Sequence, residues 1–173
     1  MSVEDELKQL ARSREEIFER DLAQMDLESP DLLMRKLRHY LAIQVDRRRL
    51  KSSNDHMVRL ETVAGGDKEL VCPGVKFLSD AQLNFKVHLQ PRQPSYVVRQ
   101  FQFHLRLSGG RNINMVRIHL NDGAAHEPER VPRCHLHIGD SRAHVPFPIM
   151  NPLLTLYLIC EHIEPDFGLD AEG

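Results

Sequence analysis

The chain has 173 residues, of which 41 % are hydrophobic and 28 % are charged, and its formal net charge is −2 at neutral pH. These values are ordinary for a globular chain and leave one domain as the default expectation. A chain without net positive charge is not a general polycation, so any contact with nucleic acid must come from a local basic patch.

The N-terminal part of the sequence predicts two helices. Apolar residues recur at helical spacing over residues 3–27, with charged residues between them. The Ser-Pro-Asp triplet at 29–31 combines a capping serine, a first-turn proline and an acid, and predicts a second helix that ends near Leu50. Residues 1–51 are therefore expected to form a helical hairpin. The basic run DRRRLK at 46–51 fits either a helix C-terminus or a phosphate contact.

From residue 56 the apolar residues alternate with a period of two, which is typical of strands. The predicted strands are HMVRLETV from His56, LNFKVHLQ from Leu83, YVVRQFQFHLRL from Tyr96, MVRIHLN from Met115 and RCHLHIG from Arg133. Glycine, proline and asparagine separate them, and Gly109-Gly110 predicts a hairpin between the third and fourth. A last helix begins at the Asn151-Pro152 cap, ends before Pro165 and is apolar nearly all round, so it should be buried against the sheet.

The predicted fold is therefore α+β. It has an N-terminal helical hairpin (1–51), a domain with an antiparallel sheet of about five strands and a buried C-terminal helix packed on it (52–165), and a mobile tail (166–173).

Strand alternation also assigns each side chain to a face of the sheet. If the patterned strands share one sheet, one face is apolar and the other displays histidine together with arginine and lysine. The residues expected on this polar face are His88, His104, His119, His135, His137, Lys86, Arg106, Arg117 and Arg133. An antiparallel sheet often has one solvated face, so an ordinary exposed surface is the competing interpretation.

Histidine titrates near neutral pH and can transfer protons or bind a metal, and arginine binds phosphate through two parallel hydrogen bonds. We therefore predict that His135 and His137 form an acid/base or metal-binding pair, assisted by His119 and His104. The predicted phosphate-binding residues are Arg106, Arg117, Arg133 and Lys86. A zinc site that adds Cys134 to the pair is unfavourable, because Cys134 points to the opposite face. The sequence leaves the presence and identity of a metal open.

The order of elements from Tyr96 onward resembles the TumE-type toxins of bacterial toxin–antitoxin pairs and related uncharacterised proteins. In this chain it comprises YVVRQFQFHLRL, a glycine turn, MVRIHLND, AHEPERVP, PRCHLHIGD and a final helix. The positions that match the family pattern are Arg117, His126, Pro132, His135, His137, Gly139 and Asp140. His119-Leu120 stands where that family has Asp-Asn, and the N-terminal half has no counterpart in those short proteins. The resemblance implies a prokaryotic, toxin-like or defence-associated protein.

Two functions follow from these patterns. The first is binding or cleavage of RNA, or of another phosphate-bearing ligand, by the His/Arg face. The alternative is a non-enzymatic adaptor or assembly subunit that uses residues 1–51 to bind a protein partner or a second copy. Three widely spaced cysteines, a charged N-terminus and the short apolar run at 153–160 predict a reduced, cytoplasmic protein that does not enter a membrane.

Overall fold

The structure is a computed structural model that describes residues 29–51, 58–108, 113–121 and 131–164. Helix α2 (Pro30–Asp46) comes first, and helix α3 (Pro152–Leu158) comes last, continued by a π-helical turn over Ile159–Ile163. Between them lie the strands β1 (Arg59–Thr62), β2 (Lys68–Lys76), β3 (Gln82–Arg92), β4 (Ser95–Arg106), β5 (Met115–Leu120), β6 (Cys134–Ile138) and β7 (Val145–Pro146).

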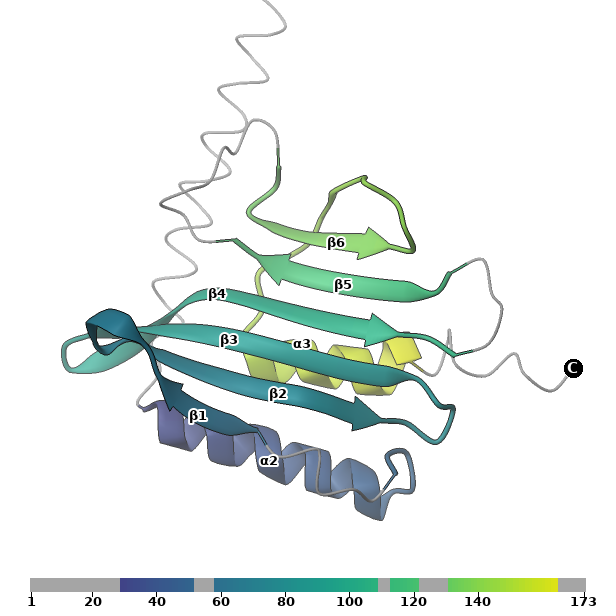
Figure 1. Cartoon of the computed structure of the whole chain (residues 1–173), viewed down its shortest axis with the longest axis horizontal. Helices are drawn as coiled ribbons and strands as arrows, with labels where there is room; N and C mark the ends of the chain where they lie inside the picture. Colours follow the sequence, from purple (N-terminus) through teal and green to yellow (C-terminus); the bar gives the residue numbers. More distant parts are fainter. Residues whose placement is uncertain (1–28, 52–57, 109–112, 122–130, 165–173) are drawn as a thin grey trace, which may run out of the picture.

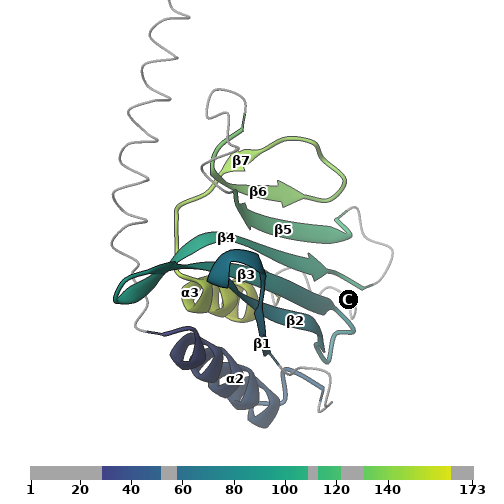
Figure 2. The ribbon, with the colours of Figure 1, turned by 60° about the vertical axis from the view of Figure 1, so that its left-hand side comes forward.

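Within these described residues, seven strands form one antiparallel sheet in the order of the chain, each paired with the next. Figure 1 shows β1 to β6, and Figure 2 also shows β7. The predicted α+β class and antiparallel sheet are confirmed, as is the hairpin formed by β4 and β5. The predicted number of strands was too low, because β2 and β7 were missed. In β2 the alternation breaks at Pro73-Gly74, where the register with β3 shifts between Cys72 and Val75. The strand β7 has only two residues and carries no periodic signal.

Both described helices pack on the apolar face of the sheet, side by side (Figure 2). The leucines of α2 that face the sheet, Leu33, Leu37 and Leu41, belong to the same buried core as Phe103 of β4. Leu156 of α3 is also fully buried, so the predicted covering of the sheet by the last helix is confirmed.

The prediction that the last helix is largely buried was only partly right. Leu154 is 47 % exposed and Tyr157 is 43 % exposed. These two side chains lie on the side of α3 that does not face the sheet, because α3 covers the sheet as an outer layer and only its inner side meets the core. The Asn151 cap is confirmed, since its Oδ1 accepts a hydrogen bond from the Leu154 amide at 2.8 Å.

Helix α2 begins as predicted, because the Ser29 hydroxyl accepts a hydrogen bond from the Leu32 amide at 3.1 Å. It ends at Asp46, earlier than the predicted Leu50. Arg48 has a left-handed backbone conformation (φ 57°), which reverses the chain and lets Leu50 pair with Phe77. The predicted first helix and the predicted tail lie outside the described residues, so the helical hairpin stays a prediction.

The basic run after α2 is used to attach this helix to the end of α3. Arg47 and Arg49 form ion pairs with Glu161 at 3.2 and 2.8 Å, and Gln44 and Tyr40 donate hydrogen bonds to the same carboxylate. Burial alone would raise the pKa of Glu161, but the hydrogen bonds from Gln44 and Tyr40 and the two arginine charges hold it below its usual range. Two of the three consecutive arginines therefore have a structural role here.

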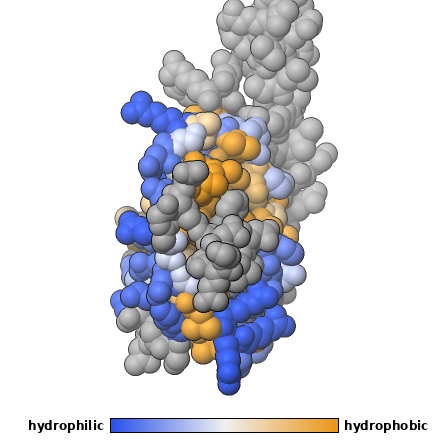
Figure 3. Space-filling model, turned by 90° about the vertical axis from the view of Figure 1, so that its right-hand side faces the viewer, coloured by the Kyte–Doolittle hydropathy of each residue, from blue (hydrophilic) through white to orange (hydrophobic). Residues whose placement is uncertain are grey.

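The described helices include none that is long and apolar enough to cross a bilayer. Viewed from one end, the surface is mainly hydrophilic, with hydrophobic side chains showing between the hydrophilic ones (Figure 3). The polar face of the sheet lies opposite the two described helices (Figure 2).

Neighbouring residues of β4 test this assignment of faces. Phe103 is fully buried, whereas Gln102 is exposed. Phe103→Ala should lower the free energy of unfolding by about 3–5 kcal/mol, because it leaves a cavity in the core. Gln102→Ala should change it by no more than about 0.5 kcal/mol. Urea unfolding followed by circular dichroism measures both, and equal effects at the two positions would contradict the assignment.

Candidate functional site

The register of three central strands places the predicted site residues on one face of the sheet. His119 on β5 lies directly opposite His135 on β6, and Arg117 lies opposite His137. On the other side of β5, Arg117 lies opposite His104 of β4. The predicted common polar face is therefore present in the structure.

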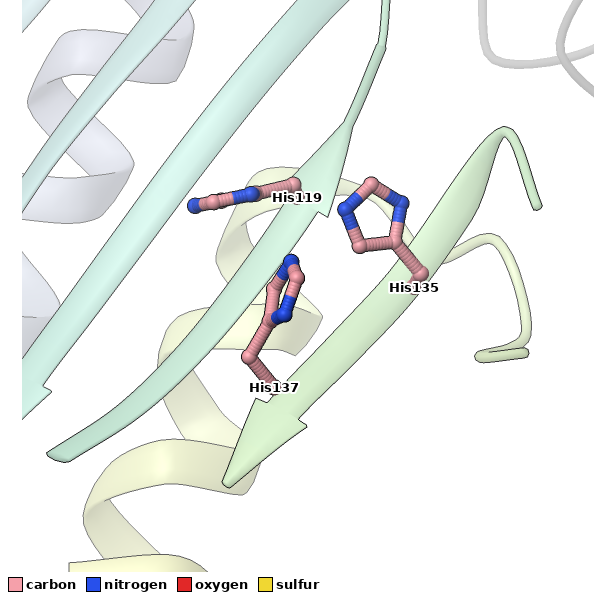
Figure 4. A group of neighbouring side chains, drawn as sticks. All are labelled: His119, His135 and His137. Carbon is pink, nitrogen blue, oxygen red and sulfur yellow. The ribbon is translucent and has the colours of Figure 1, made fainter. Parts of the chain in front are cut away.

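Five histidine rings of the described chain form a continuous cluster on this face, which we call the histidine cluster: His104, His119, His135, His137 and His144. Ring centroids of neighbouring members are 4.5–5.3 Å apart. Figure 4 shows its centre, where one ring from β5 and two from β6 gather on the same side of the strands. One ring nitrogen from each of these three, His119, His135 and His137, lies within 4.8 Å of the others.

The rings at the centre of the histidine cluster are buried, unlike the side chains of an ordinary solvated sheet face. His135 is only 2 % exposed and His137 only 7 %. The chain after β6 folds back so that β7 pairs with β6, and the ring of His144 packs against both buried rings. His144 itself is exposed, so it lies between the cluster and solvent.

Hydrogen bonds fix the orientation of several rings. Nδ1 of His135 lies 2.7 Å from the carbonyl oxygen of Pro132 and therefore donates to it, which places the lone pair of the neutral ring on Nε2. Nε2 of His104 and Nε2 of His119 are 2.8 Å apart, so one of these rings donates to the other. The nitrogen of His119 that His104 does not engage is its Nδ1.

Two buried nitrogen atoms in the cluster region have no hydrogen-bond partner among the described residues: Nδ1 of His137 and Nε of Arg117. Leaving a buried polar atom unpaired costs roughly 1–3 kcal/mol. The Arg117 guanidinium makes a long contact of 3.4 Å to the carbonyl of Gly139. Such unpaired groups, gathered in one place, are unusual in a surface that serves only the fold.

Burial and positive charge disfavour protonation of three rings of the cluster. Burial lowers the pKa of His119 to about 3, and the neighbouring histidines and Arg117 act in the same direction. Burial and the Arg117 charge also lower the pKa values of His104 and His137. These three histidines are therefore electrically neutral at physiological pH.

The backbone next to His137 acts in the opposite direction on that ring. Hydrogen bonding to the main chain of Ser141 and Ala143 raises the pKa of His137, but burial and the Arg117 charge outweigh it. Neutral imidazoles can accept a proton or bind a metal ion, but they are poor proton donors. This electrostatic setting weakens the acid/base interpretation of the pair and favours metal binding.

A shallow hollow of about 140 Å³ opens on the polar face beside the cluster. Its polar lining consists of Glu69, Lys86, His88, Gln100, Gln102, His119 and Asn121. His119 therefore belongs both to the buried cluster and to the wall of the hollow, and it connects the two.

The predicted phosphate-binding residues occupy different settings. Lys86 and Arg106 are exposed on the polar face, and Lys86 lies 3.5 Å from Glu69. Arg117 is half-buried inside the cluster. Arg133 is 5 % exposed, and its Nε donates a hydrogen bond to the main-chain oxygen of Asn121 at 3.2 Å, which favours a structural role.

Sequence reasoning missed His144. It lies outside any patterned strand, and only the two-residue pairing of β7 with β6 brings it back to the cluster.

His88 shares the polar face but pairs with Asp67 at 2.7 Å, away from the cluster. Cys134 is on the apolar side, and burial raises its pKa to about 12. His126, which the family resemblance singled out, lies outside the described residues.

Because the fold lowers the pKa of His119, the free energy of unfolding should depend on pH. The ring has a pKa of about 3 in the fold and about 6.5 in an unfolded chain. As the pH falls, the His119 ring is therefore protonated in the unfolded chain before it is protonated in the fold. Its contribution to the free energy of unfolding is full above about pH 6.5 and decreases as the pH drops toward 3. In the presence of a chelator, the free energy of unfolding should decrease from pH 7 to pH 5, by no more than about 1 kcal/mol per pH unit for this partly exposed ring.

Chemical denaturation at several pH values measures this slope. His119→Gln should make it shallower, whereas His162→Gln, at an exposed position, should leave it unchanged. An identical slope for the wild type and His119→Gln would show that His119 is not held neutral by the fold.

No protein-family model matches the sequence, and comparisons with the curated proteins and with the solved structures give no significant match.

Proposed function

We propose that the polar face of the sheet binds RNA or a similar phosphodiester, and that the histidine cluster is where this ligand is cleaved. The observation that carries the proposal is the cross-strand register, which puts Lys86, Arg106 and Arg117 on the same face as the cluster. Exposed cations attract the phosphate backbone, and this attraction does not require the whole chain to be basic.

The hollow beside the cluster supports a ligand of this kind. Its amide and ammonium side chains, from Gln100, Gln102 and Lys86, can donate hydrogen bonds to phosphate or ribose oxygens. A phosphate in the hollow would lie next to His119. Arg117, behind it, carries a buried Nε with no partner among the described residues, which could stabilise negative charge.

The resemblance to TumE-type toxins adds the proposal of a biological setting. In that setting the protein is a toxin-like or defence-associated component of a prokaryotic cytoplasm, with RNA as its target. The support is the placement of Arg117, His135 and His137, three positions of the family pattern, within one cluster.

We also propose, as a second candidate function, association of this chain with a second copy. A groove of about 440 Å³ between α2 and α3 is lined by Tyr40, Ile43, Leu153, Leu154 and Tyr157, with Lys36 and His39 beside these apolar residues. Residues 3–27 of another copy would suit it, because this segment has an apolar stripe at helical spacing and more acidic than basic residues.

The first proposal predicts RNA cleavage. Purified wild-type protein should cleave a labelled single-stranded RNA, tested with a chelator and with added divalent metal. His135→Ala/His137→Ala should abolish cleavage without loss of the circular dichroism spectrum. His162→Ala, which removes an exposed histidine beyond the cluster, should cleave like the wild type. Absence of cleavage by folded wild-type protein under both conditions would remove the proposed activity.

The same proposal predicts salt-dependent binding. Lys86→Gln/Arg106→Gln should weaken RNA binding, measured by fluorescence anisotropy. It should also reduce the slope of log K against log salt by roughly one for each phosphate that the variant no longer neutralises. Arg35→Gln on the exposed side of α2 is the matched control. Equal salt slopes for the wild type and the double variant would show that RNA does not bind at Lys86 and Arg106.

The second candidate predicts a change in oligomeric state. Light scattering should give a dimer for the wild-type chain and a monomer for Leu154→Glu, because a carboxylate in the groove opposes the apolar stripe and the net negative charge of residues 3–27. The side chain is already half-exposed, so the fold should tolerate the change. A wild-type monomer at micromolar concentration would reject this association.

A further inference from the structure

We propose that His119, His135 and His137 form a binding site for one divalent transition-metal ion such as Zn²⁺. This metal site does not depend on the proposed RNA binding, because it needs only the three side chains and would be present with any ligand of the polar face. It stands on the geometry of the three rings, on the hydrogen bonds behind them and on the chemistry of the donor set.

The geometry brings three nitrogen donors together from two adjacent strands. The ligand atoms lie within 4.8 Å of one another. A tetrahedral ion with metal–nitrogen distances of about 2.0–2.1 Å needs donors roughly 3.3 Å apart. The most widely separated of these atoms would therefore have to approach by about 1.5 Å when an ion binds. Figure 4 shows the three rings close together on one side of the strands, with the ring of His119 extending away from His135.

Metal-binding histidines commonly donate a hydrogen bond through the nitrogen that does not bind the metal. His135 has such a bond to a main-chain carbonyl, and His119 has a ring-to-ring hydrogen bond. Nδ1 of His135 donates to the Pro132 carbonyl at 2.7 Å, which directs the lone pair of Nε2 away from the main chain. Nε2 of His119 lies 2.8 Å from Nε2 of His104, and with His119 as the donor of this hydrogen bond the lone pair of its neutral ring is on Nδ1. His104 is therefore a positioning residue and not a ligand.

The third ring supplies an independent observation. His137 is only 7 % exposed, and its Nδ1 has no hydrogen-bond partner among the described residues. Burying an imidazole with an unpaired nitrogen between three other histidines is unfavourable for the fold by itself. The arrangement is explained if the ring is held ready to bind an ion.

The donor set selects the class of metal. Three imidazoles without a carboxylate suit zinc, copper, iron or nickel, whereas magnesium and calcium prefer oxygen ligands. Three histidines leave a fourth position open, as in zinc sites that carry out hydrolysis. The nearby Arg117 charge opposes a bare cation and therefore favours an anion, such as hydroxide or a phosphate oxygen, as the fourth ligand.

Metal binding is tested directly, without RNA. The metal-free 173-residue chain should bind one Zn²⁺ per chain in isothermal titration calorimetry, and Co²⁺ should give the intense visible absorption of a tetrahedral site. His119→Ala, His135→Ala and His137→Ala should each weaken binding at least about 10-fold. His104→Ala should weaken it less than a ligand variant does. His162→Ala should bind like the wild type.

A second measurement applies if a cluster variant fails to fold. Long-range ¹H–¹⁵N spectra of the wild-type protein should show Zn²⁺ shifting one ring nitrogen of each of the three histidines, and leaving His39 and His162 unchanged. No stoichiometric binding, or shifts confined to the exposed histidines, would overturn the site. Metal binding without RNA cleavage would support the metal site and contradict the proposed activity. RNA cleavage in a chelator, by protein that binds no metal, would support the activity and contradict the metal site.

Discussion

The arrangement of the whole polar face depends on the register between β4, β5 and β6. Ile118 pairs with Phe103 on one side and with Leu136 on the other, and this apolar row fixes which residues face the core. Because side chains alternate along a strand, a slip of one residue would bury His119 against the helices and expose Ile118. Burial of the apolar row therefore determines where the histidines gather, although no histidine takes part in it.

The helices secure that register from the other side of the sheet. Leu37 and Leu41 of α2 and Leu156 of α3 are completely buried, and the two helices are linked through Glu161. This carboxylate accepts hydrogen bonds from two neutral side chains and pairs with two arginines, so its charge is well compensated. Arg47 and Arg49, which the sequence offered as phosphate contacts, therefore hold the two helices together. The cations proposed to meet a ligand of the polar face are instead carried by the strands.

Alternation is enough to predict the two faces, since it depends only on local backbone geometry. The sequence alone thereby places His104, His119, His135 and His137 together, and the cap residues likewise predict where α2 and α3 begin. Alternation cannot predict β2, whose pattern is interrupted by a bulge, or the early end of α2 at a left-handed arginine. Nor can it predict the burial of His135 and His137, because that depends on a loop folding back through a two-residue strand that also delivers His144.

The electrostatic character of the cluster distinguishes two kinds of chemistry. Paired imidazoles that act as base and acid need one ring protonated near neutral pH, which requires a nearby carboxylate or good solvation. The groups that shift the pKa of His119 include no carboxylate; they are other histidines and an arginine, and together with burial they lower this pKa to about 3. Such an environment keeps the lone pairs available, and lone pairs held close together in a poorly hydrated place are what a transition metal requires. A bound ion would supply the positive charge that the rings themselves cannot carry, and an anionic ligand between the ion and Arg117 would be favoured by both.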